Sequence, residues 1–177
     1  SEVIESGYCG AHWAGDTDDE KVSYKLYADG TLIIEGEGTF AGSIFQNDDR
    51  IKTVQISEGI TELGGTYSYT FWGCKNLTTV TLPESLKSIG RMAFYECENL
   101  STINIPSGVT SIGDSTFYNC KALKSISIPD GVTSIERNTF DNCISLSNVS
   151  ISTESKLTSI GQYSFDDCKN LESLNLP

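Results

Sequence analysis

Residues 111–129 read SIGDSTFYNCKALKSISIP, and residues 134–152 read SIERNTFDNCISLSNVSIS, so one pattern returns after 23 positions. Both stretches place an isoleucine, a phenylalanine, a cysteine, a leucine and a final isoleucine at matching positions. A unit of this length cannot bury its own apolar side and must pack on its neighbours. The pattern therefore predicts a solenoid of stacked units.

The repeat extends over most of the chain. Its phenylalanines are 23 residues apart, or 25 at the last step, and each precedes a cysteine by three positions: Phe71 and Cys74, Phe94 and Cys97, Phe117 and Cys120, Phe140 and Cys143, and Phe165 and Cys168. We predict repeat units at residues 51–76, 77–99, 100–122, 123–145 and 146–170, with a partial unit at 171–177.

The unit at residues 100–122 predicts the path of each coil. Leu100, Ile103 and Ile105 lie inward while the residues between the two isoleucines alternate outward, as in a short strand. Pro106 has no N–H group to donate and ends this strand.

A second extended piece and a turn complete the same unit. Val109 and Ile112 are expected to point inward, and Gly113 is expected to take a positive φ. Phe117 and Cys120 stand at i and i+3, which predicts one face of a single helical turn. All the apolar positions of the unit would then face the interior of the coil.

Residues 1–50 lack the repeat and carry 11 acidic against 3 basic side chains. Within this acidic capping segment, residues 22–36 (VSYKLYADGTLIIEG) alternate apolar and polar side chains on both sides of Asp29-Gly30. This is the pattern of a β-hairpin. An open solenoid end exposes its core and a strand edge, so the hairpin is predicted to cap it.

The composition restricts the classes of partner. The formal net charge is −12, so a nucleic-acid backbone would be repelled and no nucleic-acid partner is predicted. Nor does any apolar run approach the roughly 20 residues of a spanning helix, which argues against membrane insertion. The last residues, LESLNLP, begin a further unit, and we expect the natural polypeptide to continue beyond Pro177.

The pattern L-x-x-I-x-I-P-x-x-V-x-x-I-G-x-x-x-F-x-x-C resembles the BspA-like (treponemal-type) leucine-rich repeats of bacterial surface proteins. The leader GTLIIEGEGTF is similar to the hairpin that precedes such repeats. The resemblance implies an α/β repeat fold, a right-handed solenoid with short parallel strands. It also implies a bacterial, exported, often wall-attached protein, in a family associated with adhesion to host proteins, other bacteria or epithelia.

Six cysteines in an exported chain suggest disulfides, but their spacing argues otherwise. Five of them take the same inward position of successive coils, where parallel Cβ vectors do not point at one another. We predict a buried ladder of free thiols that pack as small apolar side chains. Cys9 lies outside the repeat and is expected to be a packed free thiol, with pairing as the alternative.

Catalysis and metal binding find little support in the sequence. The single histidine, His12, has no visible base or nucleophile beside it, and no glycine-rich phosphate loop occurs. We predict that the chain is not an enzyme and needs no cofactor. The acidic cluster of Asp16, Asp18, Asp19 and Glu20 offers oxygen ligands for calcium, but it lacks the glycine and distal glutamate of a dedicated loop, so a solvated loop is favoured.

The outward strand positions form two uncharged columns. Stacked about 4.8 Å apart, their hydroxyl and amide groups would make a rigid polar face able to bind a protein or glycan without desolvating ions. The alternative is that Ser and Thr merely suit exposed strands. The predicted ligand-binding positions are Thr79, Thr81, Thr102, Asn104, Ser125, Ser127, Asn148 and Ser150.

Aromatic side chains cluster elsewhere in the repeats. They are expected either to form an exposed patch on another side or to be partly buried, and they are Tyr67, Tyr69, Trp72, Tyr95 and Tyr118. The sequence thus predicts a non-catalytic extracellular binding module that adheres to a host or bacterial surface protein or glycan. The alternative function is a spacer that projects another domain.

Overall fold

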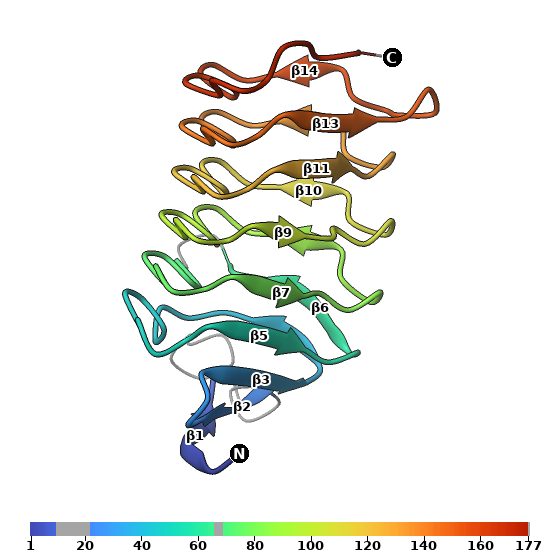
Figure 1. Cartoon of the computed structure of the whole chain (residues 1–177). Helices are drawn as coiled ribbons and strands as arrows, with labels where there is room; N and C mark the ends of the chain where they lie inside the picture. Colours follow the sequence, from blue (N-terminus) through green and yellow to red (C-terminus); the bar gives the residue numbers. More distant parts are fainter. Residues whose placement is uncertain (10–21, 66–68, 177) are drawn as a thin grey trace.

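The protein is a flattened stack of about six coils, seen in a computed structural model that describes residues 1–9, 22–65 and 69–176 (Figure 1). Each coil contributes one strand to each of two opposite faces. The strands are β1 (Val3–Tyr8), β2 (Val22–Tyr27), β3 (Thr31–Gly36), β4 (Gly38–Phe40), β5 (Thr53–Ile56), β6 (Ile60–Leu63), β7 (Thr79–Thr81), β8 (Ser88–Ile89), β9 (Thr102–Ile103), β10 (Ser111–Ile112), β11 (Ser125–Ile128), β12 (Ser134–Ile135), β13 (Asn148–Ile151) and β14 (Ser159–Ile160).

From β3 onward, the front face consists of parallel strands in register with the repeat. It begins with the sheet β1-β2-β3-β5-β7-β9 and continues as the pair β11-β13. Thr79 lies opposite Thr53 on one side and Thr102 on the other, so equivalent positions of successive coils form straight columns. The opposite face carries the shorter sheet β10-β8-β6-β4 and the pair β12-β14.

The N-terminal hairpin joins directly onto this front face. β2 and β3 pair antiparallel, with Val22 opposite Gly36 and Leu26 opposite Leu32, and β3 then pairs in parallel with β5. Val22, Leu26, Leu32 and Ile34 point inward and are buried, and Tyr24 is partly buried and packs against the core. The hairpin therefore covers the apolar end of the first coil, and β1 adds one further antiparallel strand outside it.

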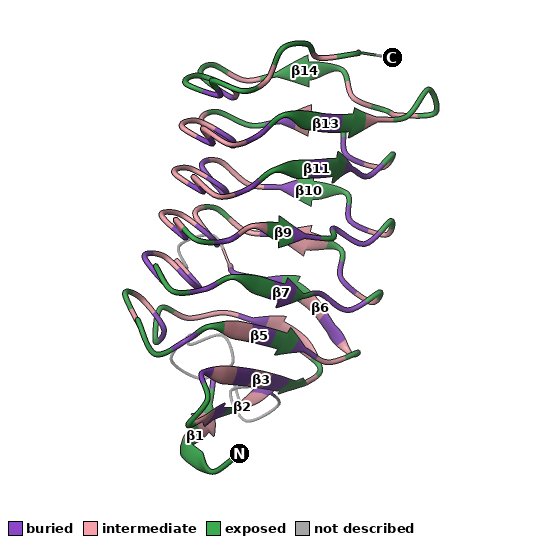
Figure 2. Ribbon diagram, in the orientation of Figure 1, coloured by how far each residue is buried: buried purple, intermediate pink, exposed green. Residues whose placement is uncertain are grey.

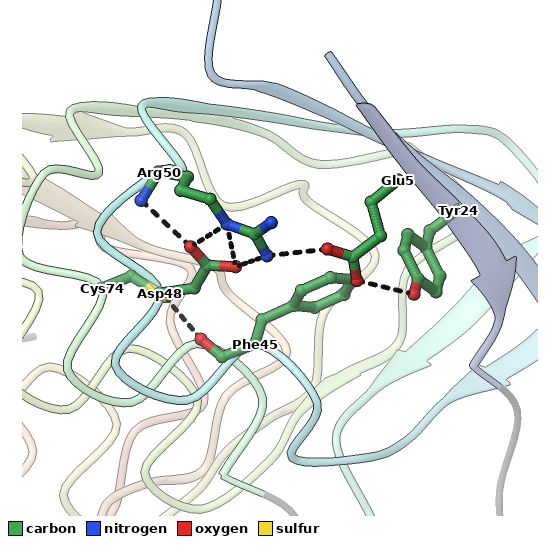
Figure 3. A network of polar contacts seen from close by, with 6 residues as sticks. All are labelled: Glu5, Tyr24, Phe45, Asp48, Arg50 and Cys74. Atoms are coloured by element: carbon green, nitrogen blue, oxygen red, sulfur yellow. Dashed lines mark hydrogen bonds and ion pairs between the residues drawn. The ribbon is translucent and has the colours of Figure 1, made fainter. Parts of the chain in front are cut away.

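A polar network fastens β1 to the first turn (Figure 3). The Arg50 guanidinium contacts the Asp48 carboxylate at 2.6 Å and the Glu5 carboxylate at 2.8 Å. Tyr24 donates its hydroxyl proton to Glu5 at 3.0 Å. Glu5 lies on β1 and Tyr24 on β2. The contacts therefore connect these two strands to the turn at residues 48–50.

A stack of phenylalanine rings runs through the interior of the coils. Phe94 and Phe117 lie 5.6 Å apart with an interplanar angle of 6°, and Phe117 and Phe140 lie 5.5 Å apart at 3°. These three rings are fully buried. The predicted inward positions of the unit at residues 100–122 are all buried as well, which confirms the inside-outside pattern of the repeat.

The predicted thiol ladder is confirmed, since the five repeat cysteines are all free and buried, and Cys9 is a free, buried thiol as expected. Each repeat cysteine directs its Sγ to the phenylalanine carbonyl of an earlier coil, as Cys97 does to Phe71 at 3.1 Å and Cys120 to Phe94 at 3.2 Å. The cysteine thus fills a small apolar space and also gives a buried carbonyl oxygen a second donor.

The predicted single helical turns are wrong, because the described residues contain no helix. Ser115 and Asn119 have φ values of 55° and 61°, in the left-handed region, and this interrupts any right-handed helical path. The Phe117 N–H group donates to the Thr139 carbonyl of the next coil at 2.9 Å instead of to its own turn. Bonds between coils therefore replace helical bonds, and the segment is a double β-turn.

The expectation for Gly113 is also wrong, since its φ is not positive. A Cβ atom at this position would lie 2.5 Å from the backbone nitrogen of Arg91 in the preceding coil. The glycine is needed for close approach between coils rather than for an unusual backbone conformation.

Candidate functional site

The two polar columns lie on the exposed side of the front sheet. All eight predicted positions are exposed, while the residues between them, Val80, Ile103, Ile126 and Val149, are buried. Exposed segments accordingly recur along the front strands (Figure 2). Ser125 lies opposite Asn148, and Ser127 lies opposite Ser150. The structure thus brings the predicted residues together in two straight rows across successive coils.

Half of these residues line a shallow hollow of about 670 Å³. It lies where the front strands end, and the predicted residues in its wall are Asn104, Ser127, Asn148 and Ser150. The other four, namely Thr79, Thr81, Thr102 and Ser125, lie outside its lining and continue the columns across the sheet.

The hollow is also lined by residues outside the two predicted columns. Pro106 and Pro129 contribute an apolar part of its wall. Glu84 and Asp130 add two carboxylates to the wall, and the Ser152 hydroxyl donates a hydrogen bond to Asp130 there. The sequence contains a signal for the two prolines, because they lie 23 residues apart and each directly follows the last isoleucine of a predicted strand. That they line a hollow depends on the path of the chain after each proline, which the spacing does not specify.

The polar side chains of the hollow are available to a partner. Within the described part of the chain, Asn104, Ser127, Asn148 and Ser150 make no side-chain hydrogen bond to another residue. Their amide and hydroxyl groups both donate and accept, and they carry no charge whose hydration must be removed on binding. This arrangement suits hydrogen bonding to peptide, hydroxyl or acetamido groups.

A second candidate lies on the edge formed by the double turns, at the left in Figure 1. Tyr69, Trp72, Tyr95 and Tyr118 form a continuous aromatic column, with centroid distances of 5.1, 5.3 and 4.6 Å between neighbours. All four rings are partly buried. The two alternatives predicted for them, an aromatic patch and partial burial, therefore both apply. Tyr67 lies outside the described residues.

Metal-binding clusters and reactive thiols were sought among the described residues. No group of three His, Cys, Asp or Glu side chains suited to a metal ion occurs there. Burial raises the pKa of the Cys74 thiol to about 12 and that of Cys168 to about 11, so the ladder supplies no thiolate nucleophile at neutral pH. His12 and the acidic cluster of Asp16, Asp18, Asp19 and Glu20 lie outside the described residues.

Nor does any helix in the described ranges have the length and apolarity needed to cross a membrane.

Comparison with solved structures identifies similar solenoids in bacteria. A leucine rich cell surface protein of Faecalibacterium prausnitzii A2-165 is 28 % identical with a TM-score of 0.65, over 88 % of this chain and 52 % of that one. The leucine-rich repeat protein of T. pallidum is 21 % identical with a TM-score of 0.58, over 88 % and 90 %. The pneumococcal vaccine antigen PcpA is 22 % identical with a TM-score of 0.59, over 75 % and 36 %.

The chain therefore spans about half of the Faecalibacterium protein and about a third of the pneumococcal antigen. A search of curated proteins finds no match. A family model described as the BspA type leucine rich repeat region matches residues 65–177 in six copies. With its fold, its register and this match in agreement, the chain belongs to the BspA-type leucine-rich repeat family.

Proposed function

We propose that the protein is a non-catalytic binding module of a bacterial surface or secreted protein. It adheres to a protein or glycan on a host or neighbouring cell through the polar columns of the front sheet. The observation that carries the proposal is this hollow, in which four uncharged side chains on three successive coils make no side-chain hydrogen bond to another described residue. The cell surface description of the Faecalibacterium protein supports the extracellular location.

The mechanism is repetition on a rigid scaffold. Each hydroxyl or amide contributes a weak contact, but the sheet holds them in register before the partner arrives, so little conformational entropy is lost on binding. Further copies of the module on one cell surface raise the effective concentration of sites and hence the avidity. Affinity for one module is then modest, while attachment of a whole cell is strong.

The test is binding of the purified chain to immobilised extracellular-matrix proteins, mucins and glycans. The variant carries Asn104→Arg with Ser127→Arg, which places two bulky cations in the hollow. The matched control carries Thr110→Arg with Thr133→Arg, at exposed positions just before β10 and β12 on the opposite face. We expect saturable binding that only the first variant loses. Equal binding by both variants would contradict the use of this face.

The second candidate function is a spacer that projects another domain. It is favoured by the absence of large apolar side chains from the eight column positions, because tight protein interfaces usually contain an aromatic or aliphatic anchor. A chain that binds nothing on the panel, yet supports adhesion by a domain fused to it, would favour this alternative.

A further inference from the structure

The edge of the double turns carries a second hollow, of about 430 Å³, which we call the tyrosine–aspartate groove. It runs along the stacking direction past four coils. One side is formed by the residues that follow the core phenylalanines, namely Tyr95, Tyr118, Asp141 and Asp166. The other side includes Asn138, Tyr163 and the exposed side chain of Arg137. The groove therefore lies on a different side of the coil from the polar columns.

The aromatic column ends inside this groove. Tyr118 stacks one ring face on Tyr95 at 4.6 Å with an interplanar angle of 11°. Tyr95 belongs to the coil before that of Tyr118, so the other face of the Tyr118 ring is directed toward the coil that follows. That coil has Asp141 at the matching position, a side chain too small to cover the ring. The groove thus combines an aromatic face on which no further ring of a described residue stacks with a carboxylate one coil away.

The groove is lined by two carboxylates, Asp141 and Asp166, and by one guanidinium group, that of Arg137. Neither Asp141 nor Asp166 has an ion pair in the described ranges, whereas the nearby Asp114 and Glu98 are paired with Arg91 and Lys121. Desolvation, followed by repulsion from Asp166 and Asp167, raises the pKa of Asp141. Arg137 lines the same groove but does not contribute to that shift. The site therefore has excess negative charge beside an aromatic face.

We propose that the tyrosine–aspartate groove binds an arginine side chain from an extended segment of a partner protein. A guanidinium group is planar, so it stacks on the open face of Tyr118 while its edge donates hydrogen bonds to the Asp141 carboxylate. The lengthwise course of the groove suits a strand-like segment, with Asp166 and Tyr163 next along its path. A neutral glycan would donate hydroxyl hydrogen bonds to these carboxylates but would leave their negative charge in place, whereas a guanidinium group neutralises it.

The test uses a fluorescein-labelled peptide of alternating glycine and arginine, whose binding to the chain is followed by fluorescence anisotropy. We expect Tyr118→Leu to weaken binding about fivefold, because the aromatic face is lost. Tyr118→Phe retains that face and should bind like the original chain. Asp141→Asn should weaken binding further than Glu154→Gln, a matched change of one charge on an exposed loop away from the groove.

Thermal melts of each variant show whether the coil remains folded. Comparison of Tyr118→Leu with Tyr118→Phe isolates the aromatic face, because the phenylalanine keeps the ring and its packing. Equal weakening by Asp141→Asn and Glu154→Gln would overturn the proposal, because it would mean attraction by net charge only. So would unchanged binding in Tyr118→Leu, or no binding of the peptide at all. Binding of a neutral chitin oligosaccharide that needs Tyr118, without binding of the peptide, would make the groove a glycan site and also overturn it.

Discussion

The repeat cysteines combine two tasks in one small side chain. Each Sγ donates to a phenylalanine carbonyl of an earlier coil at about 3 Å, in a place where an alanine would leave that carbonyl with fewer donors. Burial also raises the pKa of these thiols, to about 12 for Cys74. A thiol with so high a pKa is protonated and unreactive under ordinary conditions.

Thiol titration checks this description. At about pH 8, where an ordinary exposed thiol reacts readily, the folded chain should react very slowly with a disulfide reagent. After denaturation under non-reducing conditions, all six cysteines should react, since all are free. Fewer than six reactive thiols would mean that a disulfide exists, and fast reaction of the folded chain would mean that the ladder is open to solvent.

The polar network of Arg50, Asp48 and Glu5 predicts that the free energy of unfolding depends on pH. Hydrogen bonding to Arg50 lowers the pKa of Asp48, so the folded state favours the carboxylate form. This stabilisation is present above the unfolded pKa of about 4 and is lost as the pH falls through the lower folded value. Asp48→Asn should therefore reduce the free energy of unfolding by about 1 kcal/mol at neutral pH.

Urea denaturation of Asp48→Asn and of the original chain at several pH values measures this difference. The two curves should converge as the pH falls below about 4. A difference that stays constant down to strongly acidic pH would show that Asp48 acts through packing and not through its charge.

The double turn is the element that distinguishes this solenoid from one with helices. Asn138 has a φ of 53°, and asparagine tolerates that conformation better than other residues with a Cβ atom. Asn138→Ala should lower the free energy of unfolding by about 1 kcal/mol, whereas Asn138→Gly should be close to neutral. Denaturant unfolding of both variants provides the measurement. An alanine variant as stable as the glycine variant would contradict the left-handed turn.

The periodicity of the sequence was sufficient to predict the strands and the core, but it was not sufficient to predict the type of turn. Phe117 and Cys120, three positions apart, share one side of a helical turn and of a double β-turn alike, so their spacing did not discriminate between the two. The choice is made by hydrogen bonds between coils, such as that from Phe117 to Thr139, which involve residues 22 positions apart. The asparagines at 119, 138 and 142 were the available local signal.

The candidate sites show the same limit. The polar columns followed from alternation along one strand, and all eight positions are exposed as expected. Which of them line a hollow depends on the prolines and the turn beyond the strand. Likewise, the aromatic column was visible in the positions after the core phenylalanines, but the uncovered face of Tyr118 depends on how the rings stack.

Taken as a whole, the molecule is a one-dimensional stack in which each coil packs mainly on its neighbours. A ring in the middle, Phe117, is fully buried between two others, whereas Phe165 in the last coil is only partly buried and stacks on Phe140. Phe117→Ala should lower the free energy of unfolding by about 3–5 kcal/mol, and Phe165→Ala by clearly less. Comparable losses at both positions would contradict this nearest-neighbour description.

Binding by the front face is the central claim, and removal of residues 100–145, two complete predicted units, tests it most directly. The deletion joins equivalent positions of the repeat and removes Thr102, Asn104, Ser125 and Ser127 from the columns. It also removes Tyr118 and Asp141 of the tyrosine–aspartate groove, so the partner used is one whose binding Tyr118→Leu leaves unchanged. Affinity of this shortened chain for a partner found on the panel should be measured beside that of the intact chain. We predict a folded protein with strongly reduced affinity, and a folded protein of unchanged affinity would contradict the account.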